Sequence, residues 1–317
     1  MSAVSPESRL WDAMRGALVT RALALVADLG VADALADGPR PVDDLAHENG
    51  ADPDVLHRLL RALASDGIFV EESPGVFGNN ETSALLVGDG WRDFAHLFGG
   101  SWLEAIAGLR ADGQASFPRR HGDEFWAWLA AHQDERASFD RAMLQGHEGR
   151  LERLESIDWR GDESVVDVAG GTGALLLALL ERHPGMRGIV FDLPETVRDE
   201  SAFGDRCTFV EGSFFESVPA GADAYVLATI LHDWDDERAV AILRTIRTAA
   251  RDDSRLVLLE SVIEPGNEPS GAKWLDLLML VIAAGRERDE AQWRELLAAG
   301  GFDPVRIDGG VIEARCR

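Results

Sequence analysis

The stretch LHDWDDE at residues 231–237 places one histidine, one tryptophan and four acidic residues in seven positions. Such a cluster suits three kinds of chemistry. It could hold a metal ion, it could form the polar first turn of a helix, or it could place a histidine beside a reacting group. A histidine, whose unperturbed pKa is near 6.5, can accept a proton at neutral pH.

The acidic residues of this stretch lack the spacing of metal ligands, and the sequence contains no second ligand cluster to complete such a site. The chain has two cysteines, Cys207 and Cys316, which are too few for a disulfide framework or a four-cysteine zinc site. We therefore expect no metal. Asp235 or Asp236 is expected to cap the helix that follows, and His232 remains as the candidate base.

A second chemical feature is the stretch VVDVAGGTGALLLALL (165–180), which has the pattern of a strand, a glycine loop and a helix. Gly170, Gly171 and Gly173 allow the backbone to pass close to a ligand and to adopt positive φ. Asp192 closes the next predicted strand, 19 residues after Gly173. An acidic residue at that point typically binds the hydroxyls of a ribose.

Two kinds of cofactor use this loop geometry. A nicotinamide site requires a third glycine, but Ala174, Leu175 and Leu176 follow Gly173 here. Asp167 would repel a pyrophosphate, whereas a carboxylate suits a cationic sulfonium or ammonium group. The loop therefore favours S-adenosylmethionine (SAM) over a dinucleotide, and a glycine turn without a ligand is the alternative.

Strands and helices alternate from residue 164 onward. We expect helices over 174–183 and directly after LHDWDDE. The strands are predicted at 164–171, 188–194, 207–215, 222–231 and 255–263. This alternation predicts an α/β fold with a parallel, doubly wound, Rossmann-like sheet. Ligands of such sheets bind at the carboxyl ends of the strands, where His232 would lie.

The N-terminal part is predicted to be rich in helices. A helical pattern covers 17–38, and a short helix (43–48), a glycine turn, a helix from Asp52 or Asp54 and a hairpin follow, which is a winged-helix pattern. The stretch 41–72 holds two basic and eight acidic residues, so it is poorly suited to DNA. We expect a protein–protein role for residues 1–95, with connecting helices and the SAM-binding domain in 96–317.

The composition excludes several partners. The 317 residues carry a net charge of −25, which repels nucleic acid and anionic membranes. The longest apolar run near the C-terminus, 277–284, is too short to span a bilayer. The N-terminal residues show no secretion signal, and the low cysteine content fits a reducing compartment. We therefore expect a cytoplasmic protein.

Taken together, the chain resembles the SAM-dependent O-methyltransferases of the plant caffeate/flavonoid type, and especially their bacterial relatives in polyketide and other aromatic natural-product pathways. The resemblance covers nearly the whole chain. Its motifs are FWAWLAAHQDERASFDRAM (125–143), VVDVAGGTG, FDLP, EGSFF, LHDWDDE, LLESVI and LDLLML…GRERDEAQW (275–293).

The resemblance implies a role for individual residues. His232 matches the general base, and Glu260 and Glu287 match two acidic residues that flank it. The positions that match the cofactor site are Asp167, Ala169, Gly170, Gly171, Gly173, Asp192 (ribose), Leu193, Ser213 and Phe214 (adenine). The positions expected at the acceptor are Phe139, Met143, Asp233, Leu278 and Met279. The N-terminal domain is implied to form a homodimer and to contribute to the partner's active site.

Three positions depart from the family pattern. Ala169 replaces the first glycine of the usual GGGTG loop, and Ser213 stands where an aspartate usually contacts the adenine amino group. Ala228 replaces the lysine, arginine or serine often found four residues before the histidine. These changes put the strength of SAM binding in question.

The resemblance implies methyl transfer from SAM to a hydroxyl, with S-adenosylhomocysteine as the other product. The expected acceptor is a phenol of a small aromatic natural product or biosynthetic intermediate. Two alternatives stay open. The first is a SAM-binding relative with altered chemistry, such as hydroxylation or decarboxylation, or methylation of nitrogen or carbon. The second is a SAM-sensing regulator, against which the acidic helix-turn-helix speaks.

Overall fold

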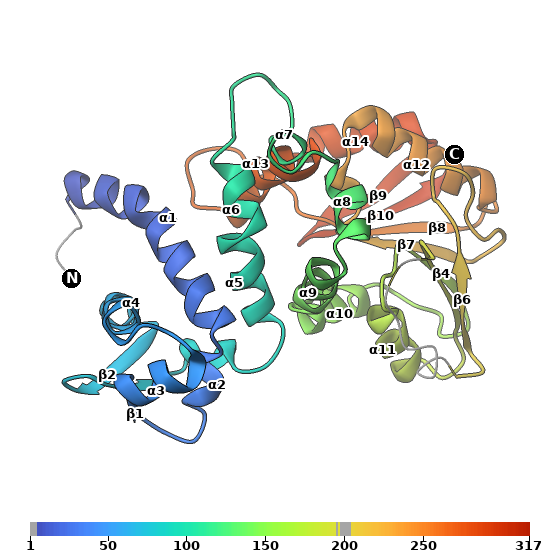
Figure 1. The fold of residues 1–317 in the computed structure, drawn as a ribbon. Coiled ribbons are helices and arrows are strands. Elements are labelled where there is room, and N and C mark those ends of the chain that lie inside the picture. Colours follow the sequence, from blue (N-terminus) through green and yellow to red (C-terminus); the bar gives the residue numbers. More distant parts are fainter. Residues whose placement is uncertain (1–4, 195, 197–203) are drawn as a thin grey trace. The chain divides into compact units, whose positions relative to one another are not determined.

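The computed structural model describes residues 5–194, 196 and 204–317. Contacts within the chain divide it into two compact units (Figure 1). The first unit contains residues 1–108 and 131–145, and the second contains residues 109–130 and 146–317. This division differs from the single predicted boundary at residue 95, because α5 (Trp91–Gly99) packs along α1 and a boundary at 95 would cut through it.

The first unit begins with the long helix α1 (Pro6–Asp28), whose N-cap Ser5 accepts a hydrogen bond from the Ser8 amide. The predicted helical stretch 17–38 is interrupted at Gly30, which has a left-handed backbone and starts the short helix α2 (Val31–Ala34). A helix-turn-helix and hairpin follow, as predicted. They comprise β1 (Arg40–Pro41), α3 (Val42–Asn49), α4 (Pro53–Ser65, capped by Asp52), β2 (Phe69–Ser73) and β3 (Val76–Asn79).

Four further helices are described in the first unit. They are η1 (Ser83–Leu86), α5, α6 (Ser101–Ile106) and α9 (Gln133–Met143). Two of them, η1 and α5, contribute Leu86 and Ala95 to the apolar core of the unit. His96 on α5 connects three of the helices, because its Nδ1 lies 2.7 Å from Asp28 on α1 and its Nε2 lies 3.4 Å from Glu135 on α9. Hydrogen bonds to Asp28 and Glu135 outweigh burial and raise the pKa of His96 to about 10, so this ring is cationic at neutral pH.

The second unit is built on a seven-stranded sheet with the order β6-β5-β4-β7-β8-β10-β9. The strands are β4 (Ser164–Val168), β5 (Arg187–Asp192), β6 (Cys207–Glu211), β7 (Ala224–Ala228), β8 (Arg255–Leu259), β9 (Phe302–Asp308) and β10 (Val311–Cys316). The five predicted strands are present and pair in parallel. The last two strands form an antiparallel hairpin next to β8 that the sequence analysis did not predict.

Helices cover both faces of this sheet, which confirms the doubly wound prediction (Figure 1). Side chains of α12 (Asp236–Ala249) and α14 (Glu290–Gly300) pack on one face, together with Val166 and Leu227. Side chains of α10 (His147–Glu155) and α11 (Ala174–Arg182) pack on the other, together with Val165 and Val226. Neighbouring strand residues thus enter opposite cores, as expected when both faces are buried.

Among the described residues, the other helices of the second unit are α7 (Phe117–His121), α8 (Phe125–Ala131), η3 (Leu231–Asp233) and α13 (Gly271–Ala283). Phe117, Phe125 and Trp128 pack edge to face and are buried, so these aromatic residues of the connecting segment form core. Within the described part of the chain, no helix combines the length and apolar character needed to cross a bilayer.

Helices α12 and α14 approach closely at Gly300, where an added Cβ would lie 2.5 Å from the Leu243 Cβ. We predict that Gly300→Ala lowers the free energy of unfolding by about 1–3 kcal/mol, because overpacking forces the helices apart. Urea denaturation measures this change. Gly149→Ala on α10 is the matched control, since nothing lies within 4 Å of its Cβ position; there the better helix propensity of alanine should leave stability equal or higher. Equal effects at both positions would contradict the close packing.

Candidate active site

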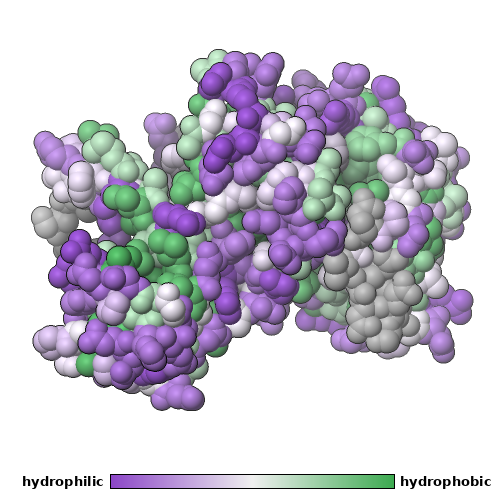
Figure 2. Space-filling view, viewed as in Figure 1, coloured by the Kyte–Doolittle hydropathy of each residue, from purple (hydrophilic) through white to green (hydrophobic). Residues whose placement is uncertain are grey.

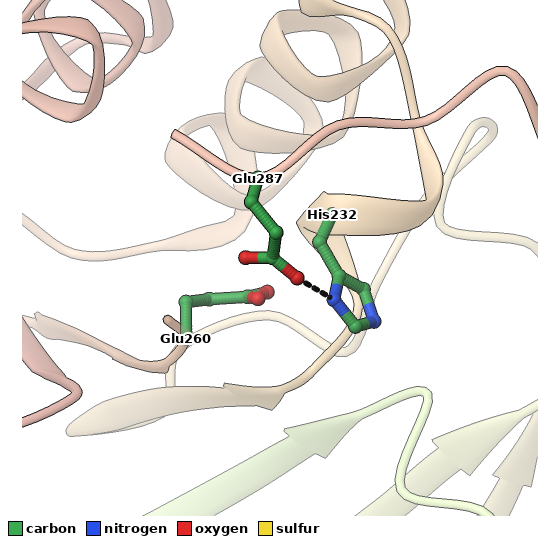
Figure 3. Close-up of side chains that lie close together, drawn as sticks. All are labelled: His232, Glu260 and Glu287. Carbon is green, nitrogen blue, oxygen red and sulfur yellow. Dashed lines mark hydrogen bonds and ion pairs between the residues drawn. The ribbon is translucent and has the colours of Figure 1, made fainter. Parts of the chain in front are cut away.

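The histidine singled out by sequence lies in η3, directly after β7 at the carboxyl edge of the sheet. Its side chain is buried. The Nδ1 atom of His232 lies 2.6 Å from Oε1 of Glu287, a residue 55 positions later in the chain (Figure 3). Because a carboxylate only accepts hydrogen bonds, Nδ1 is the donor. This fixes the tautomer and leaves Nε2 as the atom that can accept another proton.

The second glutamate, Glu260, lies after β8 and is fully buried. Its Oε1 accepts hydrogen bonds from the backbone amides of Ile230 (2.9 Å) and Leu231 (2.8 Å). Glu260 therefore holds the start of η3, while Glu287 contacts the ring. Sequence reasoning could not tell which glutamate would bind the second ring nitrogen.

Glu260 and Glu287 each have a second oxygen, Oε2, that is buried and without a hydrogen-bond partner. Together with His232, they form a group in the described part of the chain whose donor atoms lie within 4.8 Å of one another. The fold thus assembles a set of possible metal ligands that the linear sequence did not show. Nδ1 and the Glu287 Oε1 are already joined to each other, and the absence of a metal stays a prediction.

The electrostatics of the site are set by three carboxylates around one imidazole. Burial opposes the charge on His232, but Asp233, Glu287 and Glu260 outweigh it and raise the pKa of the ring to about 10. Burial also raises the pKa of Asp233 to about 7, and it raises the pKa of Glu260. The Asp233 Oδ1 lies 3.5 Å from Nε2, next to the position from which a proton would arrive.

The glycine loop follows β4 and leads into α11. Its backbone is left-handed at Ala169 (φ 58°), Gly171 (φ 59°) and Gly173 (φ 80°). At Gly170 the constraint is space, because an added Cβ would lie 2.6 Å from the Asp167 carboxylate. The alanine that replaces the family's first glycine therefore adopts a conformation that costs roughly 1–2 kcal/mol outside glycine.

Asp192, at the end of β5, binds this loop. Its Oδ2 accepts a hydrogen bond from the Gly171 amide at 2.7 Å. Its Oδ1 accepts from the Leu193 amide at 2.7 Å and from the Thr196 hydroxyl at 2.8 Å. The predicted ribose-binding acid is thus held rigidly beside the glycines, and Leu193 is partly exposed next to it.

Asp167 lies beneath the loop and is almost fully buried, with an Oδ2 that has no partner. Burial raises the pKa of this carboxyl to about 7, and Asp192 adds to the effect. The opposing charge is Arg150 on α10, a partly buried guanidinium that the sequence analysis did not consider. Arg150 stands in a charged helical stretch, HEGRLERLE, in which no pattern distinguishes it from its neighbours.

The expected adenine-binding residues follow β6. Ser213 Oγ accepts a hydrogen bond from the Phe215 amide at 3.3 Å. Phe214 packs on Phe215 and Trp234, with ring centroids 4.9 and 5.9 Å away. Trp234 also contacts the core, and Asp235 caps α12 as one of the two predicted candidates. An aromatic surface therefore adjoins the loop that carries His232.

The expected acceptor-binding residues belong to both units. Leu278 and the buried Met279 lie on α13, whose residues contact η3. Asp276 on the same helix accepts a hydrogen bond from the Glu287 amide at 2.9 Å, a support that the sequence did not indicate. Phe139 and Met143 lie on α9 in the first unit, and their contact with an acceptor stays a prediction.

Comparison with known proteins gives a consistent result. Residues 102–303 match the O-methyltransferase domain, and residues 11–89 match the O-methyltransferase dimerisation domain. The phenazine O-methyltransferase PhzM of Lysobacter antibioticus is 36% identical over 320 residues, which covers 96% of this chain and 93% of that protein. An 8-amino-8-demethylriboflavin N,N-dimethyltransferase of Streptomyces davaonensis is 35% identical, with 89% and 86% covered.

Solved structures agree with the fold. The O-methyltransferase NcsB1 from neocarzinostatin biosynthesis, in complex with SAM and 2-hydroxy-5-methyl naphthoic acid, superposes with a TM-score of 0.82 at 33% identity. The superposition covers 100% of both chains.

The contact between His232 and Glu287 generates a prediction about titration. Glu287→Gln should lower the pKa of His232 by about one unit or more, because it removes a negative charge that favours the imidazolium. NMR of protein labelled with ¹⁵N-histidine measures this pKa. Glu290→Gln, at an exposed glutamate paired with Arg294, is the control and should leave it unchanged. An unaltered pKa in Glu287→Gln would mean that this carboxylate does not control the ring.

Proposed function

This chain belongs to the SAM-dependent O-methyltransferases of the plant caffeate/flavonoid type, in their bacterial natural-product branch, and on that premise we propose that it methylates a phenolic hydroxyl of a small aromatic natural product or intermediate, with His232 as the general base. The observation that carries this proposal is the 2.6 Å contact between Nδ1 of His232 and Glu287. It orients Nε2, the other ring nitrogen, at the carboxyl edge of the sheet, where β7 neighbours the strand that leads into the glycine loop.

The chemistry is an in-line displacement. SAM supplies an electrophilic methyl group, and its transfer forms a carbon–oxygen bond while the electron pair of the broken carbon–sulfur bond stays on sulfur, giving S-adenosylhomocysteine. The chain's part is to hold the acceptor oxygen in line and to take its proton at Nε2 of His232. Alignment supplies much of the rate, and general-base catalysis typically contributes about 10²–10⁴-fold.

The raised pKa of His232 bears on this proton. A phenol has a pKa of about 10, so transfer to an imidazole of similar pKa is nearly balanced in energy. The same value means that, in the free protein at neutral pH, Nε2 carries a proton in addition to the one on Nδ1. That proton leaves before the acceptor's proton arrives, or the acceptor binds as phenolate beside the imidazolium. Either route makes kcat/KM increase as the pH rises above neutrality.

The chain's residues fit the three parts of SAM. Asp192 suits the ribose hydroxyls and Phe214 the adenine face. Asp167 has a buried oxygen without a partner and would bind the ammonium group, and Arg150, close enough to lower the pKa of that carboxyl, would pair with the carboxylate of the amino-acid end.

We also assign a homodimer to this protein. Four large apolar side chains are exposed on α1, namely Leu10, Trp11, Met14 and Leu18. Figure 2 shows hydrophobic side chains at the surface over this helix. An exposed apolar stripe of this size is typical of an interface, and it lies within the residues that match the dimerisation domain.

One alternative is favoured by a specific observation. A relative of nearly equal similarity is an N,N-dimethyltransferase, and an amine with a free electron pair needs no base. An aromatic amine is therefore the second candidate acceptor. Altered chemistry, such as hydroxylation or decarboxylation, is the third.

The proposed function is tested by incubating the protein with methyl-labelled SAM and phenolic acids, flavonoids, aromatic polyketides and aromatic amines. We expect a labelled methyl ether, and His232→Ala should lower kcat by about 10²–10⁴-fold because the base is lost. His183→Ala, which removes a histidine paired with Glu155, is the control. Methyl transfer to oxygen that survives His232→Ala would remove this residue as the base, and methylation of amines alone would favour the second candidate.

The cofactor assignment predicts that Asp167 lowers the stability of the folded protein but strengthens the binding of SAM. Its pKa in the folded protein exceeds the ordinary value, so the ionised carboxyl destabilises the fold increasingly from pH 4 to pH 7. Asp167→Asn should thus raise the free energy of unfolding at pH 8 by about 1–4 kcal/mol. It should weaken SAM binding about tenfold or more, because a charge-assisted hydrogen bond is lost.

Thermal unfolding at pH 5 and pH 8 and calorimetric titration with SAM measure these two effects. Asp162→Asn is the control, since its side chain is 75% exposed. Unchanged SAM affinity in Asp167→Asn would remove this residue from the cofactor site.

A further inference from the structure

A buried arginine adjoins the catalytic histidine and has no part in the chemistry described so far. Arg288 is fully buried. It ends a segment of five residues, 284–288, that we call the strap and that also carries Glu287. The strap packs directly on η3, because an added Cβ at Gly285 would lie 2.2 Å from the His232 carbonyl oxygen. The Arg286 amide donates to that same oxygen at 2.8 Å.

The guanidinium of Arg288 binds the backbone on both sides of His232. Its Nη1 donates to the Leu231 carbonyl at 3.0 Å, and its Nη2 donates to the Trp234 carbonyl at 2.9 Å. Its Nε donates to Asp236 in the first turn of α12 at 2.9 Å. A guanidinium presents five N–H donors in a rigid plane, whereas a lysine presents three donors from a single nitrogen and so cannot reproduce this geometry.

The surroundings of Arg288 hold it rigidly. Its guanidinium carbon lies 5.3 Å from the ring centroid of the buried Trp293, whose indole N–H donates to the Ser261 carbonyl at 3.0 Å. The Arg288 carbonyl accepts from the Ile263 amide at 3.0 Å, next to the end of β8. Glu260 holds the amide groups at the start of η3, and Arg288 holds the carbonyl groups around it.

We propose that Arg288 is a positioning residue for methyl transfer, which holds the backbone of His232 in place by binding the Leu231 and Trp234 carbonyls, so that the ring stays in contact with Glu287. It touches neither acceptor nor cofactor in this role. The claim rests on the proposed function for its kinetic consequences, since a misplaced base slows proton removal. The position of the ring itself is a property of the folded protein that can be measured without turnover.

The test compares Arg288→Gln with Arg286→Gln. Arg286 lies in the same strap and pairs with the same Asp236 at 2.9 Å, but its side chain is 44% exposed and binds no carbonyl beside His232. Arg288→Gln should lower kcat by about 10²-fold, as expected for a displaced catalytic group, with the Kd of SAM changed little. Arg286→Gln should change kcat by less than about two-fold, as an exposed substitution does.

Two further variants separate positioning from general damage. In a His232→Ala background, Arg288→Gln should cost less than about three-fold more, because both act through one group. Arg288→Lys keeps the charge but not the fork, and should still lose at least about ten-fold in kcat. If Arg288→Gln does not fold, Arg288→Lys carries the same comparisons. Wild-type kcat in Arg288→Lys, or an undiminished loss in the His232→Ala background, would overturn the proposal.

A readout independent of turnover distinguishes failure of this proposal from failure of the proposed function. ¹⁵N-histidine NMR of the wild type, recorded at a pH above the pKa of His232 so that the ring is neutral, should show distinct Nδ1 and Nε2 signals, because Glu287 fixes the tautomer. Arg288→Gln should average these signals or shift the pKa of the ring, whereas Arg286→Gln should not. Unchanged signals in Arg288→Gln would reject the positioning role, even if no acceptor were ever methylated.

Discussion

The hydrogen bond between His232 and Glu287 is the interaction that the segments around the candidate active site combine to support. It joins the loop after β7 to the segment after α13, which are 55 residues apart in sequence. His232 lies in the three-residue helix η3 and Glu287 lies in the strap, so each segment is short and needs support from its neighbours. Glu260 after β8, Asp276 on α13 and Arg288 in the strap supply this support from three directions. The central strands β7 and β8 therefore carry, at their carboxyl ends, the residues that hold the imidazole ring.

Backbone strain is concentrated around the same region. In the described part of the chain, the non-glycine residues with positive φ are Ala169, Thr229 and Ala284. Ala169 opens the glycine loop, Thr229 lies three residues before His232, and Ala284 begins the strap. A left-handed β-branched residue such as Thr229 is unusual and costs on the order of 1–3 kcal/mol. The packed sheet and its two helical layers hold these turns in place.

The sequence predicted the parts whose local pattern agrees with their environment. The β-branched run at 164–168 and the apolar run at 224–228 became parallel central strands because both of their faces are buried. The hairpin of β9 and β10 was missed, since its first strand contains Pro304 and alternating polar residues that are half exposed at the sheet edge. The individual roles of Glu260, Arg150 and Arg288 could not be predicted either, because they depend on which distant segments the fold brings together.

The path of the chain between the two units has a consequence for protein engineering. Residues 109–130 belong to the second unit, yet α9 returns to the first and is held there by the contact of His96 with Glu135. Exchanging one contiguous segment between homologues, for instance at residue 95, would pair α9 of one parent with α1 of the other. Chimeras that aim to transfer acceptor preference should therefore take residues 1–108 and 131–145 together from the same parent.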